Sequence, residues 1–284
     1  MTTLEPTAVG APAPRPAADP AAHAPVPGAL RLGYRQFRYW ITYSRRTWRG
    51  TVLSAIFGPA LYLTAMGLGL GTLVDHGNGL PGGVRYLDFV APGVLAANAM
   101  QNAFGEGTFP VLGSVKWFGN YWAAANTPQR PEDIVAGHAA LVVLRMAAIT
   151  GIFFAFMSGF GTLHSALGIL AWPASVLTGT AFLLPIMAYV VTLDSDVRLN
   201  TLFRFVMTPL FLFSGTFFPW QQLPHWAHPI AYATPLWHGV ELCRSLTLGT
   251  ATWGASLVHV AYLLAFALGG YAVARITYRR RLYK

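Results

Sequence analysis

A long stretch without charge is the strongest constraint on this chain. Residues 146–193, between Arg145 and Asp194, contain no Asp, Glu, Lys or Arg over 48 consecutive positions. A helix needs about 20 residues to cross roughly 30 Å of hydrocarbon. The stretch therefore has room for two crossings and a short turn, which we place at residues 159–164. Only 10% of the chain is charged, against roughly 25% in soluble domains, so we expect an integral membrane protein.

Apolar segments elsewhere extend this pattern to an all-α membrane protein with six transmembrane helices. We expect the spans at residues 51–73, 88–111, 134–159, 165–193, 199–218 and 255–274. Residues 1–29 are rich in Ala and Pro and are expected to form a disordered arm. The expected domains that follow are an interfacial helix at 30–49, the transmembrane domain at 50–278 and a basic tail at 279–284.

The distribution of Lys and Arg near the span ends predicts the orientation. With the N-terminus inside, 15 such residues fall in inside loops and tails, and only Arg85 and Arg244 fall outside. Both termini are therefore expected in the cytoplasm, with the chain a multi-pass protein of the cell membrane. This placement accounts for the net charge of +9 without a nucleic-acid partner. Cys243 is the only cysteine, which excludes a disulfide within the chain.

Residues 30–49 combine an apolar face and a cationic face at helical spacing. The apolar positions are Leu30, Tyr34, Phe37 and Ile41, and the cationic positions include Arg35, Arg38, Arg45 and Arg46. This pattern is typical of a helix in the membrane surface beside anionic lipid. The alternative is a plain basic stop before the first span.

The segment between the second and third spans is aromatic and cytoplasmic by the charge rule. Residues 114–126, which include Lys116, are expected to form a short helix with Trp117, Tyr121 and Trp122 on one side. Residues 128–131 end it, and Glu132 and Asp133 open the third span, where carboxylates suit a helix N-terminus. Such a helix can dock into a groove on a partner and pass motion to both spans. The alternative is an interfacial helix among the lipid headgroups.

Several polar residues fall inside the predicted spans. Asn98, Gln101 and Asn102 share one face of the second span, which should point at protein or water rather than lipid. That face either lines a substrate path, together with Thr208 and Ser214 of the fifth span, or holds helices together at about 1 kcal/mol per bond. Arg145 lies deep in the third span and needs a partner, for which we select Glu106. A structural role for this ion pair is favoured over substrate binding.

The sequence has no motif for ATP hydrolysis. The two lysines, Lys116 and Lys284, follow no Gly-rich phosphate-binding loop, so any ATPase would be another chain. Residues 219–249 form the longest outside segment, with two short helices expected to break near Pro235 and dip into the outer interface. Its histidines have no fixed carboxylate or Cys companions, and we predict neither a metal site nor a catalytic residue.

The run at residues 209–249 resembles a known family pattern. It has an apolar span ending in Ser-Gly, an aromatic residue and Pro, then Leu-Pro, a Pro-Leu-x-His step and a closing Leu-Gly. Together with residues 86–100, YLDFVAPGVLAANAM, it is similar to type-2 permeases of ABC exporters. The similarity covers residues 33–278. It is strongest to permeases of the nodulation lipo-oligosaccharide exporter, with the daunorubicin-type drug exporters more distant.

This resemblance implies an assembly and a cargo. It implies two permeases, expected to be a homodimer, with two cytoplasmic ABC ATPase subunits that bind ATP and Mg; the chain itself would bind no cofactor. Residues 114–126 would be the coupling helix, and residues 30–49 the gate or elbow helix. The residues expected to couple to the ATPase are Lys116, Trp117, Tyr121, Trp122, Glu132 and Asp133. The expected cargo is a lipid-linked glycan, a glycolipid or a hydrophobic drug. A membrane-embedded lipid-modifying enzyme and a non-transporting anchor remain as alternatives, although ten scattered acidic residues disfavour the enzyme.

Overall fold

The computed structural model describes residues 29–44, 48–76, 83–217, 219 and 228–283. Within these residues every regular element is helical, which confirms the all-α prediction. The α-helices are α1 (Ala29–Ser44), α2 (Trp48–Thr64), α3 (Thr72–His76), α4 (Tyr86–Lys116), α5 (Asn120–Ala125), α6 (Pro131–Gly159), α7 (Ala171–Val190), α8 (Val197–Leu202), α9 (Thr208–Phe213), α10 (His228–Tyr232), α11 (Pro235–Leu248) and α12 (Trp253–Leu282). Wider π-helical turns at Ala65–Gly71 and Phe203–Met207 join α2 to α3 and α8 to α9.

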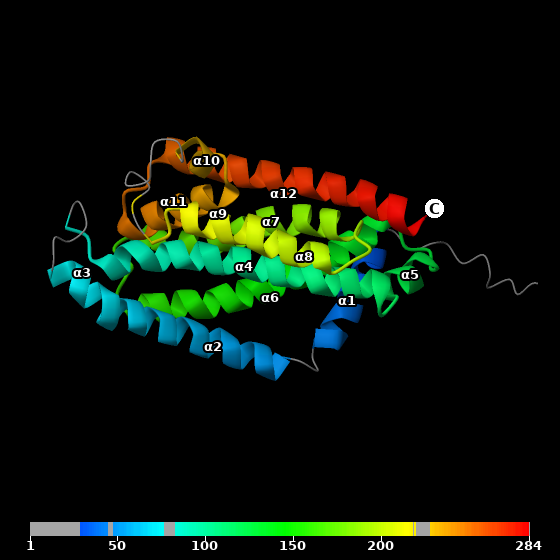
Figure 1. The fold of residues 1–284 in the computed structure, drawn as a ribbon, viewed down its shortest axis with the longest axis horizontal. Coiled ribbons are helices and arrows are strands. Elements are labelled where there is room, and N and C mark those ends of the chain that lie inside the picture. Colours follow the sequence, from blue (N-terminus) through cyan, green and yellow to red (C-terminus); the bar gives the residue numbers. More distant parts are fainter. Residues whose placement is uncertain (1–28, 45–47, 77–82, 218, 220–227, 284) are drawn as a thin grey trace, which may run out of the picture.

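The long helices α4, α6, α7 and α12 run side by side along an elongated bundle (Figure 1). Helix α7 packs between α4 and α12, and its buried face is almost entirely apolar. We call the end of the bundle with α5 and the last turn of α12 the α5 end. The opposite end, which carries α3, α10 and α11, is the α11 end (Figure 1).

Among the described residues, four helical segments are long and apolar enough to cross a membrane: residues 55–76, 131–159, 166–190 and 253–282. They correspond to the first, third, fourth and sixth predicted spans. Helix α4, the second, has 31 residues but is more polar, and most of its length is buried among its neighbours. The fifth is divided into α8, the π-helical turn and α9. The polar character of α4 is therefore explained by its central position, where protein rather than lipid surrounds it.

The structure changes two boundaries expected from the sequence. Helix α1 ends at Ser44, and Arg45 and Arg46 lie outside the described residues. Its buried side chains are Leu32, Gln36 and Trp40, whereas Tyr34 is exposed. Arg35 and Arg38 are exposed, as expected for a cationic face. Helix α12 continues to Leu282 and buries that residue, so most of the expected tail is helix.

Candidate functional site

The predicted helix at residues 114–126 is shorter than expected. Ser114 and Lys116 belong to the last turn of α4, and Gly119 interrupts the helix with a φ of +66°. Residues with a side chain rarely adopt this left-handed conformation, which glycine reaches without strain. The chain therefore reverses direction between Lys116 and Asn120, and only Asn120–Ala125 forms a separate helix, α5.

The turn at Gly119 separates the aromatic residues that the sequence places on one side. Tyr121 is fully buried, whereas Trp117 is 53% exposed and Trp122 is 40% exposed. Lys116 is also exposed. The indole Nε1 of Trp122 donates to the carbonyl of Val115 at 2.9 Å and fixes α5 against the end of α4. The α5 end thus presents two aromatic rings and a cation outward.

Tyr121 connects α5 to three other helices. Its hydroxyl contacts Nδ1 of His138 on α6 and accepts a 3.3 Å hydrogen bond from the hydroxyl of Tyr278 on α12. The ring of Trp40 on α1 stacks on His138, with the ring centroids 4.0 Å apart. A displacement of α5 would therefore press on α1, α6 and α12 through buried side chains.

Two further contacts fix the start of α6 to the end of α12. Glu132 forms an ion pair with Arg275 at 2.7 Å, and the hydroxyl of Tyr283 donates to the carbonyl of Gln129 at 2.6 Å. The carboxylate of Asp133 accepts from the backbone N–H of Arg130 at 2.9 Å. Asp133 thus caps its own helix, and Glu132 links two helices. Both carboxylates serve the architecture of this end rather than facing outward together.

The intramembrane ion pair selected from the sequence is present in the structure. Nη1 of Arg145 lies 2.9 Å from Oε1 of Glu106, which joins α6 to α4. The side chain of Arg145 is 27% exposed and that of Glu106 is 23% exposed. The pair is therefore only partly enclosed.

Among the described residues, those suggested for a translocation path make their hydrogen bonds within their own segments. Asn102 donates to the backbone and side-chain oxygens of Asn98 at 2.8 and 3.0 Å, and Gln101 is half-buried beside them on α4. Thr208 is exposed on the first turn of α9. Ser214 is fully buried and lies 2.6 Å from the hydroxyl of Thr216. The hydrogen bonds that the structure gives these residues therefore do not join the amide face of α4 to the two fifth-span residues.

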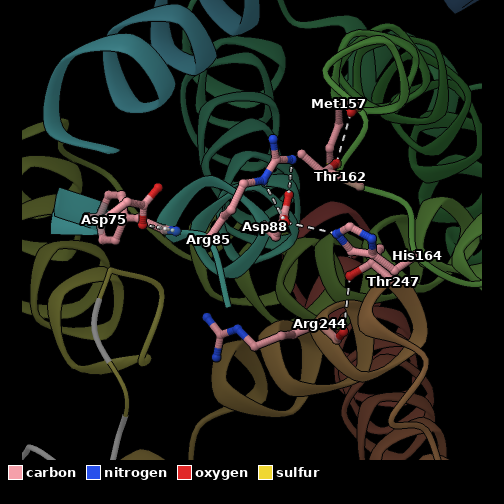
Figure 2. Close-up of polar contacts among 9 residues, drawn as sticks. Asp75, Arg85, Asp88, Met157, Thr162, His164, Arg244 and Thr247 are labelled. Carbon is pink, nitrogen blue, oxygen red and sulfur yellow. Dashed lines mark hydrogen bonds and ion pairs between the residues drawn. The ribbon is translucent and has the colours of Figure 1, made fainter. Parts of the chain in front are cut away.

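A polar cluster around Asp88 joins helices at the α11 end (Figure 2). Asp88 is buried at the start of α4, accepts two hydrogen bonds from Arg85 at 2.7 and 3.0 Å, and contacts Nε2 of His164 at 2.9 Å. The hydrogen bond to Asp88 raises the pKa of Arg85 above its ordinary value. The backbone N–H of His164 donates to the carbonyl of Thr247 at 2.9 Å. Asp88 therefore links α4 to the α6–α7 turn, which in turn contacts the end of α11.

Arg244 on α11 forms a second buried link at this end. Its Nε donates to the carbonyl of Phe89 at 3.1 Å, and its Nη2 donates to the carbonyl of Gly215 at 2.8 Å. Its guanidinium also lies 3.7 Å above the centre of the Phe89 ring. Burial lowers the pKa of Arg244 to about 10, so the side chain stays cationic at neutral pH. It joins α11, α4 and the segment after α9.

Sequence similarity identifies the family of this bundle. Residues 35–248 match the family described as ABC-2 type transporter. Nodulation protein J of Rhizobium leguminosarum bv. trifolii is 31% identical over 262 residues, which cover 86% of this chain and 94% of the relative. The proteins of the same name from Rhizobium meliloti and Bradyrhizobium diazoefficiens are 29% and 30% identical, with the same shares covered. The chain therefore belongs to the ABC-2 type transporter permeases, multi-pass membrane proteins that pair with an ABC ATPase and do not carry the ATPase domain themselves.

Proposed function

We propose that this chain is the permease of an ATP-driven exporter, and that its ABC ATPase docks on the α5 end. The observation that carries the proposal is the position of Tyr121, which joins a short exposed helix to α6 and α12 inside the bundle. Trp117, Trp122 and Lys116 supply the outward surface for the partner. The excess of Lys and Arg in the predicted inside loops supports a cytoplasmic α5 end, where an ATPase has access to ATP and Mg.

The mechanism that follows is mechanical. ATP binding closes the ATPase dimer and displaces α5. Tyr121 transmits this displacement to α6 and α12, and Trp122 transmits it to the end of α4. Two copies of the chain, each with six spans when α4 and the α8–α9 segment are included, would form the path between them. Asp88 and Arg244 would keep the segments of the α11 end together as the helices shift.

The proposed cargo is amphipathic, with a lipid-linked glycan or glycolipid favoured over a hydrophobic drug. Nodulation protein J from three rhizobia aligns along 94% of its own length, and the resemblance to nodulation lipo-oligosaccharide exporters implies this class of cargo. Such a molecule needs a polar route for its head and access to lipid for its tail. The amide-bearing face of α4 is one candidate for the polar route.

The test is reconstitution of the chain in liposomes with the ABC ATPase that copurifies from its native membrane. We expect nucleotide-dependent export of a lipo-oligosaccharide, and we expect Trp117→Ala to reduce both ATPase stimulation and export. Leu268→Ala is the control, because Leu268 is an exposed apolar residue of α12 away from the α5 end. Failure of any ATPase to copurify would overturn the proposal, as would ATPase coupling unchanged by Trp117→Ala.

A further inference from the structure

A cavity of about 270 Å³ lies between α1, α4, α6 and the turn before α5. It reaches from the α5 end into the bundle. Trp117 and Phe118 line it at the end of α4, and both rings are more than half exposed. The Glu106–Arg145 pair lines it farther in. At 1.5 Å per residue, Glu106 lies about 15 Å from the end of α4. The cavity therefore connects an aromatic mouth at one membrane surface with a polar pair inside the spanning region.

The chemistry of the lining selects the ligand. Among the residues that the structure describes, Glu106 and Arg145 are the charged ones that line the cavity, and they neutralise each other at 2.9 Å. An anionic headgroup would have to displace Glu106 from Arg145, and a cationic headgroup would have to displace Arg145. Hydroxyl groups face no such conflict, because each can donate to the carboxylate and accept from the guanidinium. The paired charges thus favour a neutral ligand rich in hydroxyls.

The aromatic residues restrict the ligand further. Phe109 supplies a flat apolar surface three residues from Glu106 on α4, and Trp117 and Phe118 supply two more at the mouth, a combination of apolar walls with a few placed polar groups that is typical of small-molecule sites. Such sites usually measure roughly 300–1,000 Å³, so this cavity suits a single ring. A sugar ring has one apolar face and a rim of hydroxyls, and it matches both parts of the lining.

We propose that the Glu106–Arg145 cavity binds one uncharged sugar of an amphiphile that enters from the membrane surface at the α5 end. This inference rests on the proposed function, because it assigns to the exporter a recognition site for the polar head of its cargo. It gives the ion pair a role beyond joining α4 to α6.

The test uses the full chain in phosphatidylcholine nanodiscs with an Asn120→Cys substitution, since Asn120 lines the cavity and is half-buried. Native Cys243 is buried and can stay in place. Octyl glucoside, below its micellar concentration, is expected to slow maleimide labelling of the introduced thiol, whereas octanol and octyl phosphate are not. Ser256→Cys, in an apolar groove formed by α7, α11 and α12, is the matched position that should show no glucoside-specific protection.

The role of the ion pair is tested by charge-neutral double variants. Glu106→Gln with Arg145→Gln should weaken glucoside protection about tenfold or more, the scale of one lost hydrogen bond to a charged group. Glu132→Gln with Arg275→Gln removes another Glu–Arg pair that does not line the cavity and should leave protection unchanged. Phe109→Ala keeps the pair and should also weaken protection, which provides a readout if the first double variant does not fold.

Equal protection by octanol or octyl phosphate would overturn the proposal, as would equal losses in the two double variants or no protection at all. The assay requires neither an ATPase nor nucleotide. A chain that is protected by octyl glucoside but never couples to an ATPase would refute the exporter and keep the sugar site. ATP-driven export without protection would refute the sugar site and keep the exporter.

Discussion

Tyr121 on α5 and Tyr278 on α12 meet hydroxyl to hydroxyl at 3.3 Å, although 157 residues separate them in the sequence. Both rings are fully buried, and their centroids lie 5.3 Å apart. The hydroxyl of Tyr121 also contacts His138 on α6. The short helix at the surface is therefore held by contacts inside the bundle, and these contacts can be removed one at a time.

The two tyrosines are expected to differ in their contribution to stability. Tyr121→Phe removes the hydroxyl that contacts both Tyr278 and His138, so two buried polar groups lose this hydrogen-bond partner. We expect the free energy of unfolding to fall by about 1–3 kcal/mol. Tyr278→Phe removes one hydrogen bond and keeps the Tyr121–His138 contact, so we expect about 1 kcal/mol or less. Thermal unfolding in nanodiscs measures both, and an equal or larger effect of Tyr278→Phe would contradict the prediction.

The turn before α5 should depend on the left-handed conformation of Gly119. A Cβ at this position would meet nothing within 4 Å, so Gly119→Ala costs only the backbone strain, about 1–2 kcal/mol. Gly119→Asn should cost less, because Asn tolerates this conformation better. We expect the unfolding temperature and the ATPase coupling to fall in the order Gly, Asn, Ala.

Gly105→Ala is the control for this series. Gly105 lies within α4, and a Cβ there also meets nothing within 4 Å. Alanine is favoured over glycine inside a helix by about 1 kcal/mol, so the control should be neutral or stabilising. Loss of stability in Gly105→Ala comparable to that in Gly119→Ala would show that backbone conformation is not the cause.

Local sequence patterns predicted the long elements of this fold well. The expected third span at 134–159 lies within α6, and the expected turn at 159–164 falls at its end, where Gly161 has a φ of +72°. The Arg145–Glu106 contact could also be anticipated, because a charge inside a span needs a partner and few acidic residues are available. Length, charge and helical spacing are local properties, and the sequence displays them directly.

The directions in which side chains point, and the contacts between residues far apart in the sequence, were not predictable in the same way. Tyr121 and Trp122 are adjacent aromatic residues, yet one is buried and the other exposed, because the turn at Gly119 sets the rotation of α5. His164 reaches Asp88 across 76 residues, and Arg244 reaches the carbonyl of Phe89 across 155. Those contacts depend on how whole helices pack against one another, and the spacing of residues within one segment of the sequence does not predict that packing.

Helix α12 crosses α7 at a position that allows only glycine. A Cβ on Gly270 would lie 2.4 Å from Cδ and 2.7 Å from the nitrogen of Pro185, and this ring has no flexible end to move away. We expect Gly270→Ala to lose about 1–3 kcal/mol through overpacking. At Gly269 a Cβ meets nothing within 4 Å, so Gly269→Ala should be neutral or slightly stabilising. Comparing the unfolding temperatures of Gly270→Ala and Gly269→Ala isolates the steric cost at Gly270. Equal effects of the two substitutions would contradict the prediction.

Arg244 should not tolerate lysine, although the charge is kept. Its fork of N–H groups donates to the carbonyls of Phe89 and Gly215 at once, and an ammonium group cannot reproduce this geometry. Arg244→Lys should therefore leave a buried carbonyl without its donor and cost about 1–3 kcal/mol. Arg204→Lys, at an exposed position in the π-helical turn before α9, should change stability little. If thermal unfolding gave equal losses for the two variants, the hydrogen bonds of Arg244 would not be what holds α11 to α4.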